Sequence, residues 1–179
     1  MPWMRPASDT PFGFRPYGKV LRVRPYLKDA SNAALYPGDV LIREAGGSVT
    51  VAAASSTQIV GVAAEYSPAS TLKADFMVYD HPEQLFYAQD DGDTTAMTET
   101  HCGQNVDLIT TTGDTTTLQS LMELDADTAA ITAGLAIKVL GLHEMEGSRN
   151  FATAAGSPRK WIVQINTHIY RDVTGQTGI

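Results

Sequence analysis

The sequence predicts a mainly β protein, an antiparallel β-barrel or sandwich with an extended N-terminal arm and at most one short helix. Three observations support this fold class. Apolar residues alternate with polar ones in several short stretches, most cleanly over residues 160–170. Gly, Thr, Ala and Asp are abundant while the helix formers Lys and Glu are scarce. Gly46-Gly47 joins two of the stretches as a tight hairpin turn would.

The ribbon over residues 36–66 is the centre of this prediction. Its three expected strands span residues 39–44, 48–53 and 58–65. The third strand is apolar on both faces, so both faces must be covered, by the core on one side and by a second sheet or a neighbouring subunit on the other. This pattern is a first indication of an oligomer.

Other stretches also read as strands. Residues 17–28 alternate until Pro25, which we expect to end the strand. Residues 76–80 and 83–89 flank a turn at His81-Pro82, and further strands are expected over 118–124 and 135–143.

The last predicted strand, residues 160–170, has an apolar and a polar face. Trp161, Val163 and Ile165 share the apolar face. The other face carries Gln164, Asn166 and His168, and we expect it to be wet.

Residues 94–103 are the expected place of the short helix. Thr94 or Thr95 would cap it, Met97 would point inward and Gly103 would end it. The single cysteine, Cys102, excludes an internal disulfide and a multi-cysteine zinc site, and we expect it to be a small buried residue.

Charge divides the chain into two parts. Residues 1–30, a basic arm rich in proline and aromatic residues followed by a first strand, carry a balance of +4, while the β-rich body of residues 31–179 carries −11. A body this acidic repels phosphate, so a nucleic-acid partner is not expected. No stretch approaches the roughly 18 apolar residues that cross a bilayer, and the prolines near the N-terminus differ from a signal peptide, so no membrane partner is expected either.

The first sixteen residues contain four prolines and three aromatic residues. Ordering them costs roughly 16 to 32 kcal/mol, while burying three aromatic side chains returns about 1.5 to 3 kcal/mol each. We therefore expect the arm to order only against a partner surface, where aromatic residues and arginine are enriched, although a disordered tail is the alternative.

Residues that could form a reactive centre are few in this sequence. His81, His101, His143 and His168 lie in separate elements, so no metal site is expected. Asp90, Asp91 and Asp93 lack the spacing of a calcium loop and read as a solvated turn.

Asp125 and Asp127 could form a carboxylate pair, but the residues around them read as a surface turn. Motifs of known hydrolases, phosphate-binding loops and zinc proteases are absent from the sequence. We expect no enzyme and no cofactor.

Seven motifs in order resemble the capsid decoration (cement) proteins of tailed bacteriophages. The motifs are FGFRP (12–16), YPGDVLI (36–42), IVGVA (59–63), DHPEQLFYAQDDG (80–92), NVDLI (105–109), LAIKVLGL (135–142) and KWIVQIN with His168. The resemblance implies a homotrimer on the outer surface of the virion's icosahedral capsid, assembled in the host cytoplasm, that binds the major capsid protein and stabilises the expanded shell. Whether the fold is a β-tulip, a jelly roll or an intermediate stays open.

Such proteins commonly reach onto the shell with an N-terminal segment, which agrees with the arm. The expected capsid-binding residues are Trp3, Arg5, Phe12, Phe14, Arg15, Tyr17, Lys19, Arg22 and Arg24. A second hypothesis is a carbohydrate-binding or host-attachment module of the virion. Its binding groove would use exposed Trp161 or Tyr170 with Asp90, Asp91 and Asp93.

Overall fold

The computed structural model describes residues 9–30, 34–70, 74–93, 95, 97–143 and 158–171. Within these ranges the chain folds into two antiparallel sheets, which confirms the mainly β class. The helical content of the same ranges is one 3-10 turn, η1 (Glu99–His101). No helix in the described part of the chain is long and apolar enough to cross a membrane.

The larger sheet has six strands in the order β1-β7-β11-β10-β8-β9. These strands are β1 (Arg15–Pro16), β7 (Leu85–Gln89), β11 (Lys160–Ile165), β10 (Ile137–Leu142), β8 (Asn105–Ile109) and β9 (Glu123–Ala130). The smaller sheet has five strands in the order β2-β6-β5-β3-β4. They are β2 (Val23–Leu27), β6 (Asp75–Tyr79), β5 (Ile59–Ala63), β3 (Val40–Arg43) and β4 (Val49–Val51).

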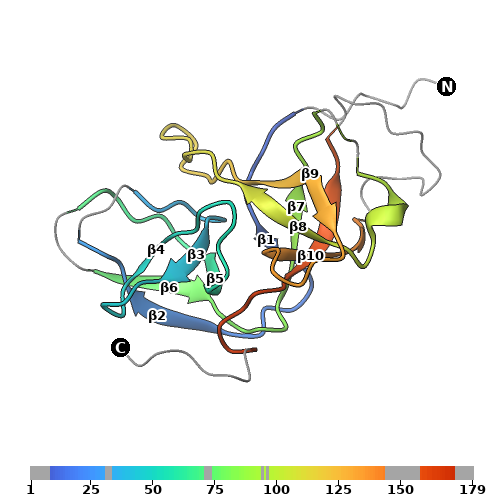
Figure 1. The fold of residues 1–179 in the computed structure, drawn as a ribbon. Helices are drawn as coiled ribbons and strands as arrows, with labels where there is room; N and C mark the ends of the chain where they lie inside the picture. Colours follow the sequence, from blue (N-terminus) through green and yellow to red (C-terminus); the bar gives the residue numbers. More distant parts are fainter. Residues whose placement is uncertain are drawn as a thin grey trace.

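The two sheets lie next to each other and share a core (Figure 1). Ile59 and Val62 of the smaller sheet pack in one apolar cluster with Phe86, Trp161 and many other residues of the larger sheet. A second cluster covers the opposite face of the smaller sheet. Burial of these side chains, at roughly 1.5 to 3 kcal/mol each, holds the sheets together.

Strand β5 is buried along its whole length. Ile59 and Val62 belong to the shared core, whereas Val60 and Ala63 belong to the second cluster. The prediction that both faces are covered is therefore confirmed, but the chain covers both itself. Its apolar pattern does not indicate an oligomer.

Several local predictions are confirmed. β3 and β4 form the expected hairpin, in which Gly47 has a φ of +81° and its N–H donates to the Glu44 carbonyl at 2.9 Å. The alternate residues Trp161, Val163 and Ile165 are all buried.

Three boundaries differ from the prediction. Pro25 does not end its strand, because β2 is an edge strand where a missing N–H is tolerated. The strand expected over residues 118–124 begins only at Glu123, because Asp114 accepts hydrogen bonds from the Thr116 N–H and the Thr117 hydroxyl, both at 2.8 Å, and builds a turn there. Leu118 lies in that turn with a φ of +54°.

The third difference concerns the end of the chain. β11 stops at Ile165, after which the backbone leaves the larger sheet and bonds with β5 of the smaller one. Ile59 donates to the Thr167 carbonyl at 3.2 Å, and Ile169 donates to the Ile59 carbonyl at 2.9 Å. This crossing buries His168, which we expected on a wet face.

The expected helix is a short turn. Met97 is buried as predicted, but η1 has three residues and begins after Thr98; Thr94 lies outside the described residues. Cys102 is exposed, contrary to the prediction, because it follows this surface turn directly.

Candidate functional site

The described part of the N-terminal segment packs against its own chain. β1 pairs with β7, and the Tyr17 N–H donates to the Leu85 carbonyl at 2.9 Å. Phe14 is 1% exposed in the shared core. The prediction that Phe14 contacts a partner is wrong, because its side chain fills the protein's own interior.

The neighbouring predicted residues also have contacts within the chain. The Phe12 ring lies 5.5 Å from the Tyr87 ring, and Lys160 Nζ lies 5.7 Å from the Phe12 centroid. Tyr17 packs edge-on against His143 at 5.6 Å. Arg15 is half-buried in β1 and Lys19 is exposed. Trp3 and Arg5 lie outside the described residues.

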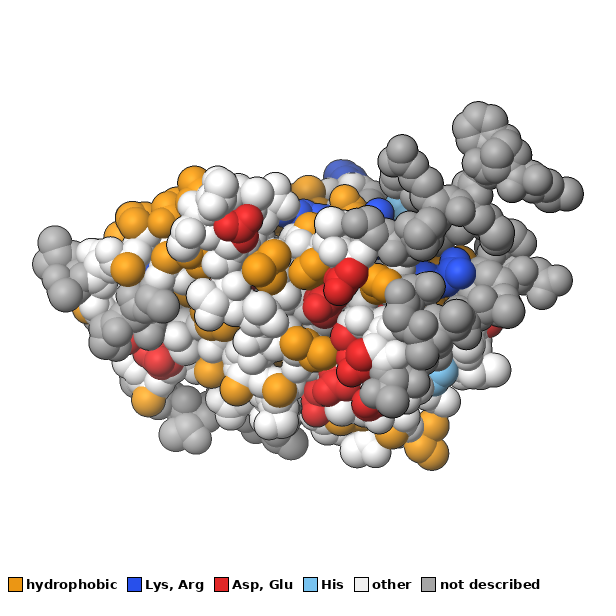
Figure 2. Space-filling view, turned by 90° about the horizontal axis from the view of Figure 1, so that it is seen from above, with side chains coloured by type: hydrophobic (Ala, Val, Ile, Leu, Met, Phe, Trp, Pro, Cys, Tyr) orange, Lys and Arg blue, Asp and Glu red, His pale blue; other side chains and the backbone are white. Residues whose placement is uncertain are grey.

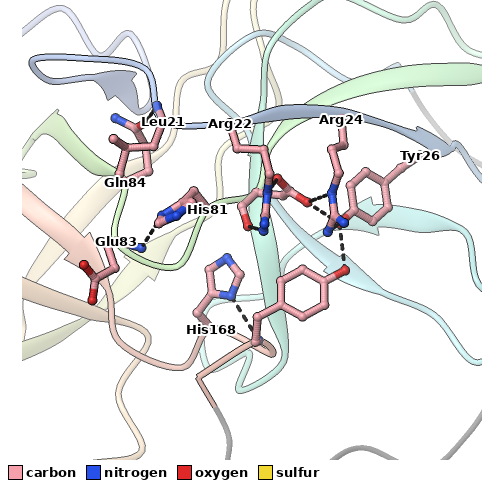
Figure 3. A network of polar contacts seen from close by, with 10 residues as sticks. Leu21, Arg22, Arg24, Tyr26, His81, Glu83, Gln84 and His168 are labelled. Carbon is pink, nitrogen blue, oxygen red and sulfur yellow. Dashed lines mark hydrogen bonds and ion pairs between the residues drawn. The ribbon is translucent and has the colours of Figure 1, made fainter.

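The remaining two predicted residues, Arg22 and Arg24, meet at Asp80. Arg22 Nε donates to Asp80 Oδ1 at 2.7 Å, Arg24 Nε donates to Oδ2, and the Tyr26 hydroxyl donates to Oδ2 at 2.7 Å. Tyr170 completes the group, with its hydroxyl 2.8 Å from that of Tyr26. We name these five residues the Asp80 cluster, and Figure 3 shows its arginines reaching toward one carboxylate.

Local structure explains how the cluster forms. Asp80 directly follows β6 and points to the same buried side of the strand as the alternate residues Phe76 and Val78. The neighbouring edge strand is β2, which pairs with β6. Because side chains alternate along a strand, one face carries Arg22, Arg24 and Tyr26. Tyr170 comes from the segment that follows the crossing to the smaller sheet.

Electrostatics hold Asp80 ionised. Burial by itself would raise the pKa of Asp80, but hydrogen bonds from Arg22, Tyr26 and Arg24 outweigh burial and lower that pKa. Burial, together with the bonds to Tyr170 and Asp80, raises the pKa of Tyr26. The Tyr170 ring lies 5.8 Å from the Arg22 guanidinium carbon and 5.3 Å from that of Arg24, within cation–π range.

The cluster is exposed on its outer side only. The Asp80 side chain is 0% exposed, whereas those of Arg22 and Arg24 are 36% and 44% exposed. Exposed apolar side chains precede and end this edge strand: Val20, Leu21 and Leu27. The cluster therefore offers a partner cations and aromatic rings, which are among the types enriched at protein interfaces.

His168 lies beside the cluster and is buried (Figure 3). Its Nδ1 accepts a hydrogen bond from the Tyr170 N–H at 3.1 Å. Burial, assisted by the positive charges of Arg171 and Arg22 and opposed by Asp80, lowers the pKa of His168 to about 4. The imidazole is therefore neutral near pH 7.

From the sequence we selected Arg22 and Arg24 for this role, named Tyr170 only for the carbohydrate-binding hypothesis and expected His168 on a wet face. Asp80 and Tyr26 were missed. One signal was available: Asp80 falls in phase with buried Phe76 and Val78, and a buried carboxylate requires cationic or hydrogen-bonding partners. The contact of Tyr170 with this cluster could not be predicted, because Tyr170 and Asp80 are far apart in the sequence.

Carboxylates gather around Glu123 of β9, on which Asp9, Asp91 and Asp90 act. Figure 2 shows a band of acidic side chains on one face of the molecule. Asp90 is buried, where it accepts hydrogen bonds from the Arg159 N–H at 2.5 Å and from Trp161 Nε1 at 3.1 Å. Burial raises the pKa of Asp90 to about 6. Asp90 is therefore part of the fold and not of a solvated turn, although Asp93 is exposed.

The burial of Trp161 contradicts its predicted role in the carbohydrate-binding hypothesis. Trp161 is 0% exposed and its indole N–H is bonded to Asp90, so its ring cannot serve as a sugar-binding platform. Tyr170 is exposed, but its ring stacks with Arg22 and Arg24.

Asp125 and Asp127 lie in β9 and not in the surface turn that we predicted. Burial raises the pKa of Asp125, and the negative charges of Asp127, Asp107 and Asp93 act in the same direction. Asp127 is exposed, and its backbone N–H donates to Asp125 Oδ1 at 3.2 Å. Among the described residues no group of three His, Cys, Asp or Glu side chains could hold a metal ion.

Comparisons of this chain with family models, with curated proteins and with solved structures find no match.

Proposed function

We propose that this protein is a capsid decoration protein of a tailed bacteriophage, which binds the outer surface of the icosahedral head as a homotrimer and stabilises the expanded shell. Its partners are the major capsid protein and two further copies of itself. The proposal includes no enzymatic activity, no cofactor and no nucleic-acid or membrane partner.

Two lines support this proposal. The first is the order of the seven motifs that resemble decoration proteins. The second, which carries it in the structure, is the Asp80 cluster: Arg22 and Arg24 are held by a buried carboxylate and present an exposed basic and aromatic surface on an otherwise acidic chain. A surface whose side chains are already ordered loses little conformational entropy on binding.

The proposed mechanism is thermodynamic. Expansion of a capsid creates new surfaces, and a protein that binds only the expanded shell stabilises it by mass action. If three copies act as one trimer, the first contact raises the effective concentration for the second and third, so modest single contacts give durable attachment.

Co-sedimentation tests the proposal directly. Expanded and unexpanded empty heads, assembled from the major capsid protein encoded with this chain, are mixed with the purified protein and pelleted. We expect saturable binding to expanded heads and at least tenfold weaker binding to unexpanded heads. Equal binding to both, or no binding to expanded heads at micromolar protein, would contradict the proposal.

The homotrimer needs its own measurement, because β5 no longer supports a subunit interface. Light scattering of the free protein and of protein released from heads gives the mass in both states. A trimer mass in either state supports the proposal, and a monomer in both contradicts that part of it.

A further inference from the structure

The Asp80 cluster joins two cations to one anion. The two oxygens of Asp80 accept from Nε of Arg22 and Nε of Arg24, one oxygen for each arginine. The group therefore keeps a positive charge after this pairing. Because Asp80 is fully buried while both arginines are partly exposed, the excess charge lies on the outer side.

Both arginines keep further donor groups. A guanidinium has five N–H groups. Arg22 uses one on the Asp80 carboxylate and one, through Nη2, on the Asp80 carbonyl at 2.9 Å. Arg24 uses one on the carboxylate and one, through Nη2, on the Tyr26 hydroxyl at 3.1 Å. Three N–H groups of each arginine stay outside these bonds.

Both guanidinium groups are held in place. Tyr170 packs against both of them, and Tyr26 lies 5.8 Å from the Arg24 guanidinium carbon. Contact with a ring face leaves the N–H edges of a guanidinium available for planar oxyanions. A second carboxylate on the outer side would complete an alternating set of two guanidiniums and two carboxylates.

We propose that Arg22 and Arg24 form a fork that binds the carboxylate of an aspartate or glutamate on the partner protein's surface. This inference rests on the proposed function for the identity of that partner, the major capsid protein. Phosphate oxygens also accept hydrogen bonds from guanidinium groups, but the acidic body of the chain repels a nucleic-acid backbone.

An NMR titration tests the fork on the free protein. The Nε–H signals of Arg22 and Arg24 are followed while the blocked peptide acetyl-Gly-Glu-Gly-amide is added, with acetyl-Gly-Gln-Gly-amide as the matched neutral control and inorganic phosphate as a third arm. We expect saturable shifts of both signals with the Glu peptide only, and no shift of the Arg43 and Arg159 signals. Equal response to the Gln peptide, or tighter binding of phosphate than of the Glu peptide, would overturn the assignment to a carboxylate.

Head binding separates this inference from the proposed function. Arg24→Gln keeps Arg22 on Asp80, and its thermal midpoint reports whether it folds. We expect about tenfold weaker binding to expanded heads for Arg24→Gln, and much less loss for Lys138→Gln, which removes the same charge in β10 of the larger sheet, outside the expected capsid-binding residues. Unchanged binding of Arg24→Gln would overturn the fork while the function stands; absent binding of the wild type would overturn the function while the NMR titration still decides the fork.

Discussion

The Phe14 N–H donates a hydrogen bond to the Gly38 carbonyl at 3.0 Å, which ties the N-terminal segment to the loop before β3. The Phe14 side chain continues this contact into the shared core. Residues from Phe12 to Tyr17 therefore contribute to the stability of the protein itself, and removing them to test partner binding would also damage the fold.

Gly13 is the position where this packing is tightest. It has a φ of +71°, and an added Cβ would lie 2.4 Å from the Ser120 Cβ and 2.8 Å from the Gly38 carbonyl oxygen. We expect Gly13→Ala to lower the free energy of unfolding by about 3 kcal/mol, through backbone strain and steric overlap together. Urea denaturation followed by circular dichroism measures the change.

Gly18 is the matched control for that substitution. Its φ is +70°, but an added Cβ would meet no atom within 4 Å. Gly18→Ala should therefore cost only about 1 kcal/mol, the strain of the left-handed conformation. Equal losses for the two variants would show that residue 13 is not closely packed.

Asp80 is the buried carboxylate that pairs with both Arg22 and Arg24. Asp80→Asn should lower the free energy of unfolding by about 2 to 3 kcal/mol, because an uncharged amide leaves two partly buried guanidiniums without their shared anion. Asp75→Asn, at the exposed start of the same strand, should change it by less than about 0.5 kcal/mol. A similar small effect for both would mean that the cluster adds little stability.

Glu123 should make the folded protein more stable at mildly acidic pH than at pH 8. Its pKa is raised to about 7, mainly by burial and further by Asp9, Asp91 and Asp90, although Gln89 Nε2 donates to it at 3.0 Å. The folded state therefore binds this proton more tightly than the unfolded state, and stability rises as pH falls from about 7 toward 4.5.

We expect Glu123→Gln to be more stable than the wild type at pH 8 by about 1 kcal/mol, a value reduced because the side chain is only half-buried. The advantage should disappear below about pH 4.5. Urea unfolding of both proteins at pH 8, 6 and 4.5 measures the difference. A constant difference across this range would contradict the raised pKa.

His168 acts in the opposite direction. Its pKa is lowered from 6.5 to about 4, so the unfolded state takes up this proton first and stability is lost as pH falls from 6.5 toward 4. The loss should be on the order of 3 kcal/mol at most. NMR of the imidazole signals should show His168 still neutral at pH 5; titration near pH 6.5 would contradict its burial.

Some of this structure could be read directly from the sequence. Strand alternation identified the buried faces of β6 and β11, and Gly46-Gly47 identified the hairpin, because side-chain period and positive φ are local properties. The sequence also located the basic segment that contains Arg22 and Arg24. The sequence did not show that Phe14 is buried in the core, since an aromatic residue in a Pro-rich segment has the same local sequence whether it packs inside its own chain or binds a partner.

Only the tertiary structure decided which strands pair and what the charged residues meet. β6 and β7 follow each other in the chain yet join different sheets. Asp80 meets Arg22 and Arg24 only because β2 pairs with β6, and Tyr170 joins them only because the chain crosses between sheets after Ile165. Alternation reports that a face is buried, whereas the choice of its neighbour depends on packing between segments far apart in sequence, which no local pattern encodes.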